Sequence, residues 1–158
     1  MLILLDIDGV MVPQKSWKPV EQLNDGFSKF SEKSIRSLNR IISETHASII
    51  LTSSHKSRYS VSKWRDIFKN RGINTSITLL DENTRNLNRK EEILNWLKNR
   101  HTNEDYIIID DDKSLNALPS NIKKLCILTS PLIGLDENSY DMTKIITKSQ
   151  PHKELVNY

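Results

Sequence analysis

Residues 2–10, Leu-Ile-Leu-Leu-Asp-Ile-Asp-Gly-Val, constrain the fold of this chain more than any other stretch. Four apolar residues in a row, followed by a turn signal, predict a strand that is buried on both faces. The side-chain period of two places Asp6 and Asp8 on the same side if the strand remains extended. Ligands of parallel sheets bind just beyond the carboxyl ends of the strands. The two acids are therefore expected where an α/β protein carries out its chemistry.

Two like charges this close together need compensation. A divalent cation is the direct solution, and Mg²⁺ prefers carboxylates, backbone carbonyls and water as ligands. An Asp-x-Asp pair is equally compatible with an ordinary acidic exit from a strand, because such a short motif is a hypothesis and not a proof. Further motifs along the chain are needed to distinguish a metal site from an acidic strand exit.

Length and composition predict one domain, at residues 1–148, followed by a polar tail at 149–158. The net charge of +3 permits an anionic substrate without indicating a nucleic-acid binder. The lone Cys126 lies in an apolar run and is expected to be a buried hydrophobe, so no disulfide is possible within one chain. The first apolar stretch has no basic region before it and is too short for a bilayer, which predicts a cytoplasmic protein with no membrane partner.

Apolar runs alternate with amphipathic segments along the rest of the chain. Strands are predicted at 47–51, 73–80, 106–109 and 125–129, and helices at 31–45, from 61 to Gly72, from 89 onward and, weakly, at 138–147. This order predicts an α/β fold, a Rossmann-like three-layer sandwich around a mainly parallel five-stranded sheet. Residues 11–30 read as a short flap over the end of the first strand. Trp17 in this flap is expected to pin it to the body of the domain; stacking on a substrate ring is the alternative.

Polar residues follow three further elements. Thr52 and Ser53 end the second strand and are suited to a phosphate, although a capped helix start would use the same residues. Arg89 and Lys90 open a helix, where cations oppose the macrodipole unless a phosphate lies nearby. Residues 110–112 are three aspartates that repeat the first pattern at the end of a buried strand, and we interpret them as metal ligands.

These groups together fit phosphoryl transfer through a covalent intermediate. One carboxylate attacks phosphorus and forms an aspartyl-phosphate. A second carboxylate protonates the leaving oxygen and then activates water. A divalent metal relieves the repulsion between carboxylate and phosphate, while a lysine and a hydroxyl hold the transferring oxygens.

Four segments of the chain resemble, in order, the four motifs of the haloacid dehalogenase (HAD) superfamily of phosphohydrolases. The matching segments are residues 6–10, residues 49–52, Lys90 and residues 107–111. The resemblance implies a HAD-like, capless domain with only the short flap, and Mg²⁺ as cofactor. It implies that Asp6 is the nucleophile and a metal ligand, and that Asp8 is the general acid and base with its backbone carbonyl on the metal. Thr52 and Ser53 would contact the phosphate, and Lys90 or Arg89 would be the cation that steadies the phosphoryl group. Asp111 would be a metal ligand, and Asp110 a further ligand or the support of one.

Two narrower resemblances concern the substrate. Phe30 and the helix that starts Arg89-Lys90-Glu91-Glu92 resemble the small HAD domains of Swiss Army knife RNA-repair proteins. The loop Ser53-Ser54-His55-Lys56 departs from the Ser-Ser-Trp-Arg-like loop of that family. Lys-Glu-Glu-Ile followed by Ile-Asp-Asp also resembles the phosphatase domain of phage-type polynucleotide kinase/phosphatase. Whether Arg89 or Lys90 takes the third-motif role remains open at this stage.

The resemblance implies phosphorylated RNA or DNA ends, or nucleotides, as substrates, with 3′ and 5′ ends both possible. A basic rim around an open site would suit such a polymer end; its candidate members are Lys15, Lys18, Lys29, His55, Lys56 and Arg58. A small phosphorylated metabolite is the alternative substrate, and a catalytically silent HAD-fold binding module is the alternative function. The sequence predicts no oligomeric state.

Overall fold

The computed structural model describes residues 1–15 and 17–150. Its centre is a five-stranded sheet in the order β3-β2-β1-β4-β5, in which every neighbouring pair is parallel. The strands are β1 (Leu2–Leu5), β2 (Ser48–Leu51), β3 (Ile77–Leu79), β4 (Tyr106–Asp110) and β5 (Cys126–Leu128). The predicted α/β fold with a parallel five-stranded sheet is therefore confirmed, with the first strand at its middle.

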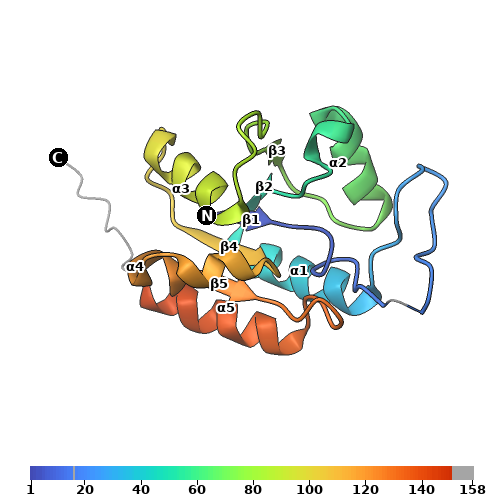
Figure 1. The fold of residues 1–158 in the computed structure, drawn as a ribbon. Coiled ribbons are helices and arrows are strands. Elements are labelled where there is room, and N and C mark those ends of the chain that lie inside the picture. The colour runs from blue at the N-terminus through green and yellow to red at the C-terminus, as the bar shows by residue number, and fades with distance from the viewer. Residues whose placement is uncertain (16, 151–158) are drawn as a thin grey trace.

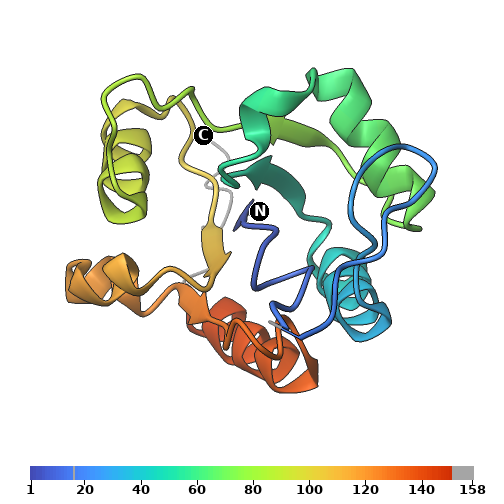
Figure 2. The same cartoon turned by 45° about the vertical axis from the view of Figure 1, so that its right-hand side comes forward.

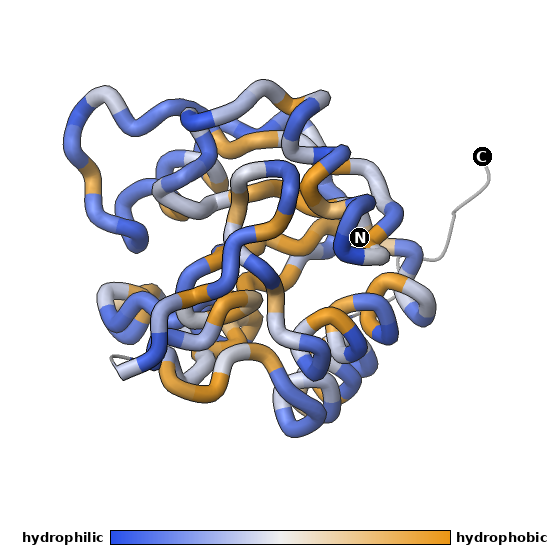
Figure 3. The backbone as a smooth tube through the Cα atoms, turned by 90° about the vertical axis from the view of Figure 1, so that its right-hand side faces the viewer, coloured by the Kyte–Doolittle hydropathy of each residue, from blue (hydrophilic) through white to orange (hydrophobic). Residues whose placement is uncertain are grey.

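Helices cover both faces of the sheet and make three layers (Figures 1 and 2). The α-helices are α1 (Glu32–Thr45), α2 (Val61–Asn70), α3 (Arg89–Asn99), α4 (Ser120–Lys123) and α5 (Glu137–Ser149), and two 3₁₀ turns, η1 (Lys56–Arg58) and η2 (Lys113–Ala117), complete the set. Helices α1, α2 and α5 share one apolar core with the sheet, while α3, η2 and α4 share the other. Figure 3 shows apolar segments concentrated at the centre and hydrophilic segments around them.

The strand β1 illustrates why the sheet is buried on both sides. Ile3 and Leu5 belong to the core on the α1 face, and Leu4 belongs to the core on the α3 face. All three side chains are fully buried. Alternating side chains of one strand thus fill two different cores, which is the reason that its sequence is continuously apolar.

Side-chain caps determine where the helices start. Ser31 caps α1 by accepting a hydrogen bond from the Ser34 amide, as the sequence pattern predicts. Asn88 and Glu91 form a reciprocal capping box at the start of α3. This box fixes Arg89 as the first residue of α3.

The predicted boundaries hold to within two residues except at the start of the third strand, and the last helix extends into the predicted tail. The third strand comprises only Ile77–Leu79, because the Ile73 amide instead donates a hydrogen bond to the Phe68 carbonyl and closes the end of α2. Helix α5 continues to Ser149, so the expected polar tail begins inside a helix. The remainder of that tail, 151–158, lies outside the described residues.

The flap at residues 11–30 is held by contacts other than the predicted one. Trp17 is 76% exposed and therefore does not pin the flap to the domain. Asp25 instead forms a buried pair with Arg71 at the end of α2, with Oδ2 to Nη1 at 2.5 Å and Oδ1 to Nη2 at 3.0 Å. Hydrogen bonds from Arg71 hold the pKa of Asp25 well below its usual range. Phe27 adds an apolar contact by packing edge-on against Trp64.

Cys126 is buried, as predicted, and burial raises the pKa of its thiol to about 12. Among the described helices, none combines the length and apolar character that a membrane crossing requires.

Candidate active site

The carboxyl ends of the central strands bring the predicted polar residues to one edge of the sheet. The Asp6 amide donates to the Ile109 carbonyl of β4 at 3.1 Å. The Thr52 amide donates to the Leu5 carbonyl of β1 at 2.9 Å. The adjacent strands β2, β1 and β4 therefore end at the same level, and their carboxyl ends carry Thr52, Asp6 and Asp110.

Three carboxylates gather at this edge. Asp6, Asp110 and Asp111 each direct one oxygen into a group whose members all lie within 4.8 Å of one another. Asp110 is fully buried and Asp6 is 6% exposed. Such a set of oxygen donors fits a hard divalent cation such as Mg²⁺.

Burial disfavours the charged form of all three carboxylates. It raises the pKa of Asp6 to about 8, an effect that the charge of Asp110 increases and the charge of Arg89 opposes. Burial likewise raises the pKa of Asp110 to about 6 against the opposing charge of Arg89, and it raises the pKa of Asp111. Asp6 therefore needs more positive charge than the protein itself provides in order to be ionised at neutral pH.

Arg89 provides the positive charge that the protein does contribute. Its Nη2 lies 3.6 Å from Asp6 Oδ1, and its Nε lies 3.0 Å from Asp110 Oδ2. The Nε and Oδ2 atoms are not aligned for a hydrogen bond, and neither has another hydrogen-bond partner among the described residues. Arg89 Nη1 also donates to the Thr52 carbonyl. The guanidinium is thus held between the ends of β1, β2 and β4.

Lys90 also matches the third motif, and the resemblance to polynucleotide phosphatases favours it over Arg89 for that role. The Lys90 amide donates to Ser114 Oγ at 3.1 Å, and its ammonium makes no ion pair with the described residues. Successive helical residues point about 100° apart, from the ~3.6 residues in each turn. Because the capping box starts α3 at Arg89, the guanidinium of that residue reaches the ends of the strands, and no ion pair joins Lys90 to the acids among the described residues.

A second buried pair lies behind Arg89. Glu92 Oε1 is 3.2 Å from Arg89 Nη1, and Glu92 Oε2 is 3.0 Å from Lys56 Nζ. Lys56 is only 5% exposed, so it does not belong to the expected basic rim. It instead neutralises Glu92, which leaves Arg89 available to the aspartates.

Thr52 and Ser53 follow β2 as predicted and are both buried. Thr52 Oγ1 has no hydrogen-bond partner among the described residues. Such an orphaned hydroxyl is costly unless a ligand binds it. Ser53 Oγ accepts a hydrogen bond from the His55 amide at 3.2 Å.

Asp8 lies at the open side of the site, and sequence reasoning missed its partner. His55 Nε2 is 2.7 Å from Asp8 Oδ2, and the imidazole packs edge-on against Phe27 with a centroid distance of 5.6 Å. The sequence placed His55 in the polar cluster after the second strand and among the candidates for a basic rim, without a contact to Asp8. Its place in the polar cluster after the second strand was a signal, but spacing alone does not reveal a contact across 47 residues.

Gly9 turns the chain between the two catalytic candidates and the flap. Its φ is +76°, and a β-carbon there would lie 2.1 Å from Asp111 Oδ2. We expect Gly9→Ala to destabilise the fold by roughly 1–3 kcal/mol and to displace the Asp111 carboxylate. Thermal unfolding and Mg²⁺ titration will measure both effects.

Gly26→Ala is the matched control, because Gly26 has a φ of +81° but open space around its β-carbon position. It should cost stability without changing Mg²⁺ affinity. Equal Mg²⁺ affinity in Gly9→Ala would contradict the close approach of Asp111.

A parallel sheet covered on both faces, with buried aspartates at the carboxyl ends of β1 and β4, is the arrangement expected of a HAD-like domain. A model of the family described as "HAD domain in Swiss Army Knife RNA repair proteins" matches residues 2–140 of the 158. The chain therefore belongs to this family. No curated protein and no solved structure matched the chain.

Proposed function

We propose that this domain is a Mg²⁺-dependent phosphomonoester hydrolase that acts on nucleic-acid ends or nucleotides through an aspartyl-phosphate. The observation that carries the proposal is the buried Asp6 carboxylate, which shares a group of oxygens within 4.8 Å with Asp110 and Asp111. The unpartnered Thr52 hydroxyl beside this group supports it, since a phosphoryl oxygen would satisfy that hydroxyl.

The residues divide the reaction between them. Asp6 attacks phosphorus, the bond to the leaving oxygen breaks, and the Asp8 carboxyl gives its proton to that oxygen. A water molecule then attacks phosphorus while Asp8 takes its proton, which releases phosphate and restores Asp6. Thr52 Oγ1 and the Arg89 guanidinium hold the transferring oxygens. In this proposal Arg89, and not Lys90, is the third-motif cation.

Asp6, Asp110, Asp111 and the backbone carbonyl of Asp8 would hold the metal ion. A bound Mg²⁺ would neutralise the carboxylates and the phosphate, which otherwise repel each other. The donor set fits this ion, because it consists of oxygens alone and because burial raises the pKa of every carboxylate in the group.

Mg²⁺ is expected to stabilise the protein more at pH 8 than at pH 5. The pKa of Asp6 is about 8 in the folded state against 3.8 for the ordinary side chain. Without metal, its contribution to stability is full below 3.8 and falls as the pH rises toward 8, because the unfolded chain releases the proton more easily. Thermal unfolding with and without Mg²⁺ at both pH values measures this; an equal or larger shift at pH 5 would argue against these metal ligands.

His55→Ala is expected to slow hydrolysis of esters with poor leaving groups. His55 Nε2 contacts Asp8 Oδ2, so in this proposal Asp8 Oδ1 carries the proton to the leaving oxygen. We expect a roughly tenfold loss of kcat on a nucleotide, which is part of the ~10²–10⁴ that general acid catalysis contributes. On p-nitrophenyl phosphate, whose leaving group needs no proton, we expect less than about a twofold loss. Equal losses on both esters would remove this role from His55.

Phosphate release from three kinds of substrate tests the proposed function. A 3′-phosphorylated oligonucleotide, a 5′-phosphorylated oligonucleotide and a panel of mononucleotides and sugar phosphates are compared with Mg²⁺ present and Asp6→Asn as control. The family description and the short flap support the first two or the mononucleotides. A preference for sugar phosphates would contradict the substrate class, and inactivity on all of them would favour a binding module.

A further inference from the structure

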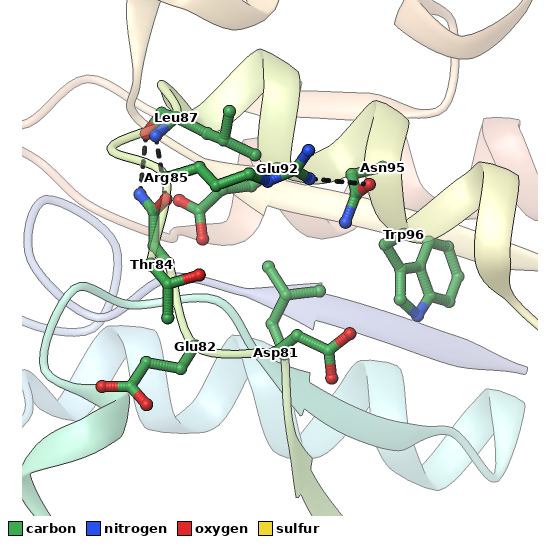
Figure 4. Close-up of a pocket in the computed structure, with 10 residues that line it drawn as sticks. Asp81, Glu82, Thr84, Arg85, Leu87, Glu92, Asn95 and Trp96 are labelled. Carbon is green, nitrogen blue, oxygen red and sulfur yellow. Dashed lines mark hydrogen bonds between the residues drawn. The ribbon is translucent and has the colours of Figure 1, made fainter.

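A small polar pocket lies between helix α3 and the loop that follows β3 (Figure 4). Its volume is about 210 Å³. Pockets for drug-sized ligands usually hold ~300–1,000 Å³. The volume therefore suits one flat ring system and not a whole nucleotide.

Two contacts connect this pocket to the catalytic residues. Glu92 lines the pocket and also contacts Arg89, which in turn contacts Asp6. Leu80 lines the pocket as well, and its amide donates to the Leu51 carbonyl immediately before Thr52. The pocket is thus joined to the proposed phosphate contacts, Thr52 and Arg89, through Leu80 and Glu92.

Hydrogen bonds hold the loop of the pocket in one conformation. The Asn83 side chain accepts from the Leu87 amide and donates to the Leu87 carbonyl, both at 2.8 Å. Arg85 Nη2 donates to Asn95 Oδ1 at 3.2 Å and ties the loop to α3. The wall is therefore formed before a ligand arrives, which reduces the entropic cost of binding.

Three polar groups face the interior of the pocket (Figure 4). The Asp81 carboxylate and the indole nitrogen of Trp96 are directed toward each other across the pocket. Arg85 donates a hydrogen bond to the oxygen of the Asn95 side-chain amide, and the nitrogen of that amide points into the pocket. The pocket thus offers one charged acceptor beside two donors, with no hydrogen bond among the described residues that already uses the Asp81 carboxylate or the Trp96 indole.

We propose that this pocket binds the nucleobase of the phosphorylated nucleotide, and this inference rests on the proposed function. A nucleobase edge presents ring or amino N–H donors beside nitrogen or oxygen acceptors. Such an edge complements the Asp81 carboxylate together with the Trp96 and Asn95 donors. The negative charge of Asp81 excludes a second phosphate from the pocket. The pocket therefore binds the nucleobase while Arg89 and Thr52 hold the phosphate.

The test compares each nucleoside monophosphate with the ribose phosphate that carries its ester on the same hydroxyl but lacks a base. In the wild-type protein we expect kcat/KM to be at least about tenfold higher with a base, the value of one well-placed hydrogen bond. Asp81→Asn and Trp96→Phe should each reduce this advantage about tenfold and leave the base-free ester unchanged. Glu82→Gln is the matched control, because it removes the same charge from a side chain that is directed away from the Asp81–Trp96 gap.

Nucleoside binding by equilibrium dialysis provides a readout that does not depend on turnover. The inactive Asp6→Asn protein should bind unphosphorylated nucleosides, and addition of Asp81→Asn should weaken that binding about tenfold. Hydrolysis of the base-free ester at the rate of the nucleotides would overturn the pocket while leaving the phosphatase proposal standing. Nucleoside binding without any Mg²⁺-dependent hydrolysis would overturn the phosphatase proposal and keep the pocket.

Discussion

Asp6→Asn is expected to lower phosphate release by about 10⁴-fold or more, because the nucleophile is lost while the other residues remain. The same substitution should stabilise the metal-free protein at pH 8. Burial raises the pKa of Asp6 to about 8, so its ionised form is unfavourable inside the folded domain. A neutral amide of the same shape avoids that cost, and we expect roughly 1–3 kcal/mol of added stability.

Activity assays and thermal unfolding of the same preparation separate the two effects. Asp105→Asn, an exposed carboxylate remote from the acidic group, serves as the control and should change neither activity nor stability appreciably. Full activity in Asp6→Asn would rule out the covalent route. A clear loss of stability in Asp6→Asn would contradict the electrostatic description of the group.

Arg89→Gln is expected to destabilise the fold by about 3–5 kcal/mol and to reduce activity at least ~10²-fold. The guanidinium contacts Asp6, Glu92 and Asp110, so its removal leaves buried carboxylates without their partner. The charge of Arg89 opposes the upward pKa shifts of Asp6 and Asp110. The loss of stability should therefore be larger at pH 8 than at pH 5, where those acids bind protons more readily.

Lys90→Gln is the matched control for this variant, since it removes the same charge from the neighbouring residue. We expect a change in stability of about 0.5 kcal/mol or less and activity within a few-fold of the wild type. If Arg89→Gln does not fold, Arg89→Lys keeps the charge and still tests the geometry through its activity. A greater loss in Lys90→Gln than in the Arg89 variants would return the third-motif role to Lys90.

The position of the acidic group was predictable because it follows from simple periodicity. Continuous apolar runs at residues 2–5 and 106–109 predict strands buried on both faces, and parallel strands end at a common edge. Asp6, Asp110 and Asp111 therefore had to meet once the order of elements was recognised. The structure brings them within 4.8 Å of one another.

The remaining features depend on contacts that sequence spacing does not encode. The contact of Arg89 with the aspartates depends on the capping box that starts α3, because a shift of one residue along the helix turns a side chain by about 100°. The contact between Asp8 and His55 joins two loops across 47 residues. Trp17 looked like an anchor by residue type, but the Asp25–Arg71 pair holds the flap instead.

The most direct test of the central claim is to trap the phosphoryl group on the protein. The wild-type protein turning over p-nitrophenyl phosphate with Mg²⁺ is quenched in acid, digested with pepsin and examined by mass spectrometry. We expect one phosphoryl group on Asp6, its absence in Asp6→Asn, and its accumulation in Asp8→Asn because the second step needs that carboxylate. Turnover by the wild type with the phosphoryl group on a different residue, or sustained turnover by Asp6→Asn, would contradict this claim.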